Sequence, residues 1–373
     1  MIRVLHIIDH LGPGGAQTAL LNLLKRRDAA RFDCTVAAMH GQGATVPEFT
    51  ALGVRVISLS PRKMPPFYLL TLPKLIKAGK FDVVHFHLFG ANWIAKPLAW
   101  LLGARVLFNH DQCNDAMRER WRYLFADWVT NLFSTKILAV SKSTVSFLRD
   151  REKIAAAKLE YFPNGVDVQA FHPATPEQRL AARQRWNLPT EGLLVGGVGR
   201  LAPQKDFATF LVAAARLRTK MPDVHFVIFG EGPEDEALAK QAERLGVPVS
   251  FPGYAADRHA IYQAIDVLFL TSKYEGTPLV VLEAMAARVP VCASAVDGVA
   301  EVLTSGETAS LFPPRHPEAA AEALGALLAD PAKRERQAAA AREQVERHFD
   351  VVEQMGRLEA FYEEEIARRK GKQ

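Results

Sequence analysis

Short apolar runs alternate with amphipathic segments along most of the chain. The first run spans residues 2–8, and after a glycine-rich turn Ala19, Leu20, Leu23 and Leu24 recur at helical spacing. Runs that are apolar on both faces of a strand are typical of parallel sheets covered by helices. The pattern therefore predicts an α/β protein, with further strands near residues 34–39, 54–59, 82–87, 106–111, 137–141, 193–198, 225–229, 267–270 and 289–294.

The length of 373 residues is enough for two hydrophobic cores. Proline and glycine are dense over residues 161–173, which is typical of a connector. We therefore predict an N-terminal domain over residues 1–170 and a C-terminal domain over residues 171–345. An amphipathic helix over residues 346–373 completes the chain.

The composition is that of an ordinary globular protein, with 49% hydrophobic and 23% charged residues. A net charge of +5 favours anionic ligands or a phospholipid surface, and it does not call for a nucleic acid partner. The three cysteines lack metal-ligand spacing, which indicates a reducing, cytoplasmic compartment. No apolar stretch is long enough to cross a bilayer, so we expect any membrane contact to be peripheral, at the inner face.

One segment, residues 274–285, combines several signals of a ligand site. It follows the apolar strand at residues 267–270, breaks at Gly276, and then offers Thr277 and Pro278 as residues that start a helix. Open α/β sheets bind ligands at the carboxyl ends of their strands. Backbone N–H groups around residues 278–280 and the positive end of the helix dipole suit a diphosphate there.

Two carboxylates flank this helix start. Glu275 stands just before it and Glu283 lies on its second turn, so both side chains can face one pocket. Carboxylates beside an anion site are expected to accept hydrogen bonds from hydroxyl groups, which sugars supply. The alternative is that Glu275 is a loop charge and Glu283 belongs to a solvated helix face.

Two other strand ends carry loops that suit phosphate. Gly14 and Gly15 lie between the first strand and its helix, where a backbone without side chains can approach an anion. After the strand at residues 193–198, Arg200 and Lys205 can neutralise a diphosphate. The alternatives are a plain tight turn and solvated surface charges. A dinucleotide fingerprint is incomplete because Ala202 replaces its third glycine, which makes a nicotinamide dehydrogenase the least favoured enzyme.

Polar residues also end two strands of the first domain. Alternation places His85 and His87 on one side of their strand, with His87 nearer the carboxyl end. Asn109 and Asp111 end the next strand and could face an acceptor. A histidine at a strand end is more often a hydrogen-bonded part of the scaffold than a ligand-binding group, so both interpretations of His87 stay open.

Several motifs together resemble the retaining family 4 glycosyltransferases of the GT-B type. They are the E-x7-E pair Glu275 and Glu283, and the segments at residues 14–17, 82–87, 164–167, 199–205, 230–234 and 251–253. The resemblance covers nearly the whole chain. It implies two facing Rossmann-like domains with parallel sheets and a cleft between them, and a last helix that crosses back to the N-terminal domain.

The resemblance also implies roles for residues. His87 would contact the transferred sugar, Gly15 the donor diphosphate, Glu275 the sugar hydroxyls and Glu283 the ribose. The catalytic set would be His87, Arg200, Lys205 and Glu275. Asn109 and Asp111 are assigned to the acceptor side from their place at a strand end alone. The donor-binding set would be Gly14, Gly15, Gly199, Gly230, Gly253, Gly276, Thr277, Pro278, Leu279 and Glu283.

The expected reaction is transfer of a sugar to a polysaccharide, lipopolysaccharide or lipid-linked acceptor, with retention of configuration. The donor would be a UDP-, GDP- or ADP-sugar, and no cofactor is expected. No D-x-D triplet for a divalent cation is visible, so we predict a metal-independent enzyme. Basic and aromatic residues mix over residues 62–68 and 118–128, which suits an anionic membrane or a lipid-linked acceptor. The alternative is an ordinary surface loop and a half-buried helix.

The chain departs from the family pattern in three places. Arg288 and Ala309 stand where glycines are common, and Asp297 and Ala300 replace the glycine and proline of a loop that usually offers N–H groups to the donor. A carboxylate at 297 would repel phosphate unless it binds a sugar hydroxyl. Two alternatives therefore stay open: a catalytically weak sugar-nucleotide-binding partner protein, and a sugar-nucleotide epimerase of the same fold.

Overall fold

The computed structural model describes residues 1–41, 43–60, 68–88, 90–112 and 120–371, and they form two compact units. The N-terminal unit comprises Met1–Gly165 and Val351–Gln373, and the C-terminal unit comprises Val166–Asp350. The boundaries thus fall at residues 165/166 and 350/351, where the sequence prediction had 170/171 and 345/346. The last helix belongs to the N-terminal unit.

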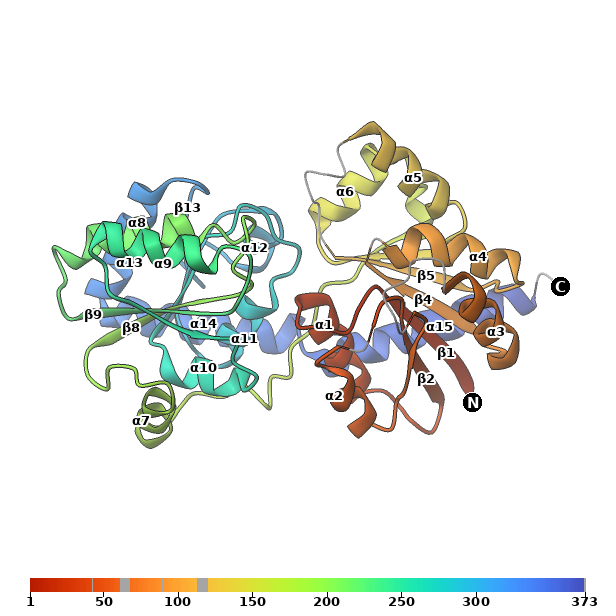
Figure 1. Cartoon of the computed structure of the whole chain (residues 1–373), viewed down its shortest axis with the longest axis horizontal. Coiled ribbons are helices and arrows are strands. Elements are labelled where there is room, and N and C mark those ends of the chain that lie inside the picture. Colours follow the sequence, from red (N-terminus) through yellow and green to blue (C-terminus); the bar gives the residue numbers. More distant parts are fainter. Residues whose placement is uncertain (42, 61–67, 89, 113–119, 372–373) are drawn as a thin grey trace. The chain divides into compact units, whose positions relative to one another are not determined.

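A seven-stranded parallel sheet forms the centre of the N-terminal unit, in the order β3-β2-β1-β4-β5-β6-β7 (Figure 1). Its strands are β1 (Ile2–Ile8), β2 (Phe32–Ala38), β3 (Arg55–Ser58), β4 (Val83–His87), β5 (Leu107–Asp111), β6 (Lys136–Ala139) and β7 (Leu159–Tyr161). Its helices are α1 (Gly15–Lys25), α2 (Val46–Ala51), α3 (Tyr68–Gly79), the π-helical turn η1 (Ala91–Ala95), α4 (Lys96–Leu101), α5 (Trp121–Asn131), α6 (Lys142–Asp150), the short η3 (Ala156–Lys158) and α15 (Val351–Lys370).

Helices cover both faces of this sheet, as the apolar runs predict. One face of β1, β4 and β5 packs against α1 and α15 through residues such as Val4, Leu20 and Tyr362. The other face packs against α3, η1 and α4 through residues such as Leu5 and Leu72. Burial on both sides explains why these strands are apolar at nearly every position.

The C-terminal unit contains a six-stranded parallel sheet in the order β10-β9-β8-β11-β12-β13. Its strands are β8 (Leu193–Val198), β9 (Val224–Phe229), β10 (Val249–Gly253), β11 (Val267–Leu270), β12 (Val291–Ser294) and β13 (Ser310–Phe312). Its helices are α7 (Pro176–Arg185), α8 (Phe207–Arg218), α9 (Asp235–Leu245), α10 (Arg258–Ala264), α11 (Leu279–Ala286), α12 (Asp297–Val302), α13 (Pro317–Ala329) and α14 (Pro331–His348).

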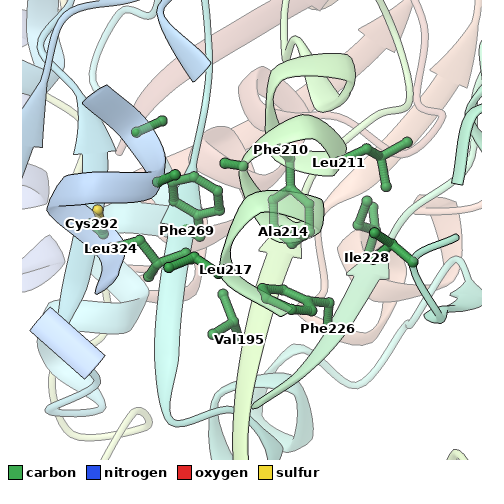
Figure 2. Close-up of a cluster of buried hydrophobic side chains, with 14 of the residues drawn as sticks. Val195, Phe210, Leu211, Ala214, Leu217, Phe226, Ile228, Phe269, Cys292 and Leu324 are labelled. Atoms are coloured by element: carbon green, nitrogen blue, oxygen red, sulfur yellow. The ribbon is translucent and has the colours of Figure 1, made fainter. Parts of the chain in front are cut away.

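The core of the C-terminal unit lies between the sheet and helices α8 and α13. Figure 2 shows Phe210 and Leu217 of α8 among Val195, Phe226 and Phe269 of the strands. The rings of Phe210 and Phe269 are 5.0 Å apart, at a distance typical of stabilising aromatic pairs. This packing fixes α8, and therefore the loop between β8 and α8, relative to the strand ends.

The prediction of two α/β domains with parallel sheets is confirmed, and the strands at residues 2–8, 193–198 and 267–270 are placed correctly. Residues 137–141 were the last strand predicted for the N-terminal domain, which is wrong because β7 adds an edge strand at residues 159–161. The strand β13 was also not foreseen. Both strands have only three residues, too few for a periodic pattern to identify them.

Candidate functional site

The C-terminal sheet has its topological switch point between β8 and β11. The chain leaves β8 toward β9 and β10 and returns to β11 on the other side of β8. The loops that follow β8 and β11 therefore diverge at neighbouring strand ends, which is where open α/β sheets bind ligands. The first loop carries Arg200 and Lys205, and the second carries Glu275, Gly276 and the start of α11.

An ion pair joins these two loops. Lys205 Nζ lies 2.5 Å from Glu275 Oε1, and both side chains are largely buried. Ser272 Oγ donates to the same carboxylate oxygen at 2.6 Å. The hydroxyl of Thr271 donates to the backbone carbonyls of Lys205 and Asp206, each at 3.0 Å. The ammonium is therefore held at the strand ends, and it still has N–H bonds to offer a ligand.

Arg200 lies at the end of β8 and is exposed. Within the described part of the chain its guanidinium makes no hydrogen bond or ion pair. Backbone groups of the same loop are fixed, since Gly199 N donates to Phe229 O and Leu201 N donates to Glu231 O, both at 3.0 Å. A fixed backbone with an unpaired guanidinium suits the binding of an anion such as a diphosphate.

The start of α11 differs slightly from the sequence prediction. Pro278, expected as the first helical residue, is instead the N-cap, and the helix begins at Leu279. Proline has no N–H, and Val281 N already donates to Pro278 O at 3.0 Å. The amides of Leu279 and Val280 thus precede the first bonded amide, so no carbonyl of their own helix can accept from them.

Glu283 is held by two residues that the sequence analysis did not identify. Its side chain is only 2% exposed, the hydroxyl of Tyr262 donates to Oε2 at 2.8 Å, and the guanidinium of Arg258 contacts Oε1. Burial raises the pKa of the Tyr262 hydroxyl, so the phenol keeps its proton and remains a donor. A ribose hydroxyl at Glu283 would have to share the carboxylate with this pair.

Close backbone approaches explain several of the glycines. A Cβ at Gly230 would lie 1.8 Å from the carbonyl oxygen of Gly199, and Gly230 N donates to Gly253 O at 2.9 Å. A Cβ at Gly298 would lie 1.8 Å from the carbonyl oxygen of Gly276. The first two contacts hold the loops after β8, β9 and β10 together, and the third holds the loop after β11 against the start of α12, so this backbone is fixed before any ligand binds.

Asp297 and Arg288 show how the chain tolerates its departures from the family pattern. The Asp297 carboxyl accepts a hydrogen bond from the backbone of Glu275, while burial and the neighbouring Glu301 and Glu275 raise its pKa. Arg288 has φ +56°, the left-handed conformation that favours glycine, and its side chain pairs with Glu335 at the surface. At position 288 the left-handed backbone conformation is therefore retained although the residue is arginine instead of glycine.

The N-terminal sheet has its own switch point, between β1 and β4. The loop after β1 carries Gly14 and Gly15, and Gly15 begins α1. A Cβ at Gly14 would collide with the side chain of Gln17, whereas a Cβ at Gly15 would meet no atom within 4 Å. The Asp9 carboxylate accepts from the amides of Gly90 and Ala91 and thereby ties this loop to the residues after β4.

His87 belongs to a cluster of four buried histidines on the α15 side of the sheet. His6 Nδ1 and His87 Nε2 are 3.1 Å apart, the rings of His85 and His87 stack at 4.3 Å, and His85 Nδ1 lies 2.5 Å from the Tyr362 hydroxyl. The prediction that His85 and His87 share a side is confirmed. His87 is only 1% exposed, so in this structure its ring is not open to solvent.

Burial lowers the pKa of all four histidines, to about 3 for His6 and about 4 for His110. For His85 and His87, repulsion from the other histidines of the cluster lowers the pKa further. The rings are therefore neutral at pH 7. Among the described residues, His6, His85 and His87 form a group whose ligand atoms lie close enough for one metal ion. No carboxylate belongs to that group, so a divalent cation would be buried there without a compensating charge.

Asn109 and Asp111 point away from the histidines, toward a second buried polar network. Asn109 Nδ2 donates to Asn131 Oδ1 at 3.2 Å, and Lys96 Nζ donates to the same oxygen at 3.0 Å. Asn131 in turn donates to Glu152 at 3.0 Å. Burial lowers the pKa of Lys96 to about 7. Both predicted acceptor-side residues are themselves buried in this structure.

The residues that sequence reasoning missed are the partners of those it found. Arg258 and Tyr262 lie on α10, and His6 and His110 lie on strands next to His87. No spacing rule connects them to Glu283 or His87. The sheet order brings His6 and His110 beside His87, whereas Arg258 and Tyr262 reach Glu283 through the contact of α10 with α11. If the strand order is known, alternation of side chains along β1 and β5 places His6 and His110 on the same face of the sheet as His87.

Comparison with known proteins matches both units. The Glycosyl transferases group 1 profile covers residues 178–344, and the Glycosyltransferase Family 4 profile covers residues 13–170. A Bacillus subtilis relative named as a glycosyltransferase, EpsF, is 27% identical over 319 residues, which are 82% of this chain and 81% of EpsF. D-inositol 3-phosphate glycosyltransferase of Salinispora tropica is 30% identical over 284 residues, which are 69% of this chain and 58% of that relative.

Solved structures show the same fold. Anabaena HepE in complex with UDP and glucose matches with a TM-score of 0.86 at 22% identity, over 98% of this chain and 100% of HepE. WaaG, a glycosyltransferase involved in lipopolysaccharide biosynthesis, matches with a TM-score of 0.76 at 18% identity, over 96% of this chain and 98% of WaaG. With the two profiles spanning most of the sequence and two parallel Rossmann-like sheets, this chain belongs to the group 1, family 4 glycosyltransferases of the GT-B fold.

Proposed function

We propose that this glycosyltransferase moves a sugar, with retention of configuration, from a nucleoside-diphosphate sugar to a polysaccharide, lipopolysaccharide or lipid-linked acceptor. The observation that carries the proposal is the pairing of Lys205 with Glu275 at the switch point of the C-terminal sheet, beside the unpaired Arg200. HepE, which shares the fold, is described in complexes with UDP, with UDP and glucose, and with UDP-glucose.

The chemistry follows from where charge develops. When the bond between the sugar and the diphosphate breaks, negative charge grows on the departing diphosphate. Lys205, Arg200 and the amides of Leu279 and Val280 would stabilise that charge more in the transition state than in the ground state, which is what accelerates a reaction. Glu275 would accept hydrogen bonds from the sugar, and Glu283 from the ribose.

In the mechanism that the family resemblance implies, the acceptor attacks from the face that the diphosphate leaves, and the departing phosphate takes the acceptor proton. The C–O bond to the phosphate breaks and a C–O bond to the acceptor forms on the same face. His87 would contact the transferred sugar. Because His87 is buried and bonded to His6 in this structure, that contact would require the ring to become accessible.

The first experiment identifies the donor. A panel of UDP-, GDP- and ADP-sugars should contain at least one compound that raises the melting temperature, since a ligand that binds only the folded state stabilises it. The stabilising donor is then incubated with candidate acceptors, and NMR reads the anomeric configuration of the product. A product of inverted configuration contradicts the retaining mechanism, and a panel with no stabilising compound contradicts the donor class.

Metal independence is part of the proposal. Stabilisation by Lys205, Arg200 and helix amides leaves no step that needs a divalent cation, so transfer should proceed fully in EDTA. Activity that is lost in EDTA and restored by manganese would contradict this. The trio His6, His85 and His87 would then be the first metal site to examine by substitution.

A catalytically weak sugar-nucleotide-binding protein is the second candidate, and Asp297 is the observation that favours it. Its carboxyl lies beside Glu275, where the family usually offers N–H groups to the donor. Donor binding without transfer or hydrolysis, together with a gain of activity in Asp297→Gly, would support this candidate. An epimerised donor in the NMR spectrum would instead identify an epimerase.

A further inference from the structure

Helix α5 has its polar and apolar faces reversed. The side chains that it buries include Asp127, Thr130 and Asn131, which join the polar network around Lys96 or lie beside it. The exposed side is apolar: Trp121 is 79% exposed, Phe125 59%, Trp128 40% and the following Leu132 54%. These positions recur at helical spacing, so they form one stripe. A helix of a globular domain normally presents the opposite arrangement to water.

Neighbouring helices also carry exposed apolar residues. Trp100 and Leu101 of α4 are exposed, and so are Leu69 and Leu70 of α3. The elements pack side by side, because the Trp93 ring stacks on Tyr123 at 5.2 Å and the Trp100 ring lies 5.1 Å from Phe133. Figure 1 shows α3, α4 and α5 on the N-terminal unit. We call the eight exposed apolar residues on or directly after these helices the apolar surface: Leu69, Leu70, Trp100, Leu101, Trp121, Phe125, Trp128 and Leu132.

Positive charge accompanies the apolar surface. Over the described residues 68–88, 90–112 and 120–134, six cationic side chains are exposed: Lys74, Lys77, Lys80, Arg105, Arg120 and Arg122. The acidic residues there are the exposed Asp82, which directly precedes β4, and the buried Asp111 and Asp127. The cations stand next to the apolar groups, since Leu70, Lys74 and Lys77 share a helix face and the Arg105 guanidinium lies 5.6 Å from the Trp100 ring centre.

We propose that the apolar surface docks the protein onto an anionic phospholipid bilayer. Tryptophan and phenylalanine insert favourably at the boundary between headgroups and acyl chains, and adjacent Lys and Arg bind anionic headgroups. The excess of exposed cations over exposed carboxylates among these residues favours an anionic lipid surface as the occupant. Among the described helices none is long and apolar enough to span a membrane, so the contact is peripheral. Residues 61–67 and 113–119, which hold much of the basic and aromatic sequence noted above, lie outside the described residues.

The test is co-sedimentation of the full chain with vesicles, without any sugar nucleotide. Vesicles with about one third phosphatidylglycerol should bind the protein, and pure phosphatidylcholine vesicles should bind it at least about tenfold more weakly. The double variant Trp121→Ser, Phe125→Ser should lose at least about tenfold in affinity for the anionic vesicles. The matched control is Leu180→Ser, Tyr254→Ser, which removes two exposed apolar side chains of the C-terminal unit and should bind like the unchanged protein.

A second pair of variants separates charge from apolar contact. Lys74→Gln, Lys77→Gln should weaken binding to anionic vesicles and leave the weak binding to neutral vesicles unchanged, and added salt should have the same effect. Circular dichroism confirms that each variant is folded. Binding that is equal for the two vesicle types, or unaffected by Trp121→Ser, Phe125→Ser, overturns the proposal. A third outcome also overturns the proposal: the protein does not bind vesicles but forms a concentration-dependent dimer, and the double variant abolishes that dimer. A second copy of the chain would then cover the apolar surface.

Discussion

The two switch points of this protein handle buried polar groups in opposite ways. At the C-terminal sheet, charged groups meet in pairs: Lys205 with Glu275, and Arg258 with Glu283. At the N-terminal sheet, His6 and His87 meet as neutral rings, and burial keeps them uncharged. A buried charge is tolerated only with a partner, whereas a histidine can avoid the cost by releasing its proton.

The difference indicates where charge can act on a ligand. The C-terminal edge presents cations and free amides that are in place before the ligand arrives, which suits stabilisation of a diphosphate. At the N-terminal edge the histidine rings are buried and neutral beside a glycine loop, and the Asp9 carboxylate there is held by the amides of Gly90 and Ala91. The two sites should therefore respond differently to a change in pH, to removal of a charged side chain and to a larger side chain in place of glycine.

Lowering the pH should give the largest effect, and mainly in the N-terminal unit. The folded-state pKa values of His6 and His110, about 3 and about 4, lie below the unfolded value of 6.5. The unfolded chain therefore takes up more protons below pH 6.5, so the stability present above that pH falls as the pH approaches 4. Between pH 7 and pH 5 the loss should be about 2 kcal/mol for each of the two residues.

Tryptophan fluorescence can follow this loss, because four of the five tryptophans lie in the N-terminal unit. His110→Phe should make the dependence of stability on pH shallower, since it removes one group of lowered pKa. The control is His225→Phe, because the five histidines of the C-terminal unit are all partly or fully exposed. Equal slopes for His110→Phe and the unchanged protein would show that the cluster is not what titrates.

Removing the ammonium at the C-terminal edge should give the next largest effect. Lys205→Ala should lower the rate constant for transfer about a hundredfold or more, because one cation that stabilises the developing charge is lost. Lys205→Arg keeps the charge and should recover part of the rate. The control Lys240→Ala removes an exposed lysine whose pair with Glu236 lies on the surface of α9. A rate that is unchanged in Lys205→Ala would remove this residue from the site.

Adding one methyl group at Gly15 should give a smaller effect, on donor binding alone. The new Cβ would meet no atom of the protein within 4 Å, so the fold should accept it. If the diphosphate lies against this glycine, Gly15→Ala should weaken donor binding about tenfold, by steric contact of the methyl group with the bound ligand. Gly356→Ala, in α15, has equally open space and is the control. Unchanged binding by calorimetry would place the donor elsewhere.

The smallest effect should come from Arg288→Gly. Glycine relieves the left-handed conformation at φ +56°, but it loses the surface pair with Glu335 and makes the unfolded chain more flexible. These contributions oppose one another, so we expect the free energy of unfolding to change by less than about 1 kcal/mol. A chemical denaturation curve measures it, and a change of several kcal/mol would mean that Arg288 has a structural role beyond this pair.

Sequence reasoning recovered those parts of the fold and site that depend on local pattern. Apolar runs located the long strands, and Gly276 with Pro278 located the start of α11 within one residue. Sequence reasoning did not recover the contacts between side chains of different helices or different strands. Arg258 and Tyr262 reach Glu283 only because α10 packs beside α11, and His87 is covered because His6 lies on the neighbouring strand. No residue spacing encodes these contacts, since each joins two different helices or two different strands.

The most direct measurement compares how a nucleoside diphosphate and its nucleoside bind, using the base that the melting-temperature panel selects. If Lys205 and Arg200 hold the diphosphate, then Lys205→Ala and Arg200→Ala should each weaken binding of the diphosphate at least about tenfold and leave binding of the nucleoside unchanged. Calorimetry gives both dissociation constants. Equal losses for the two ligands, or none for the diphosphate, would contradict the assignment of this edge as the donor site.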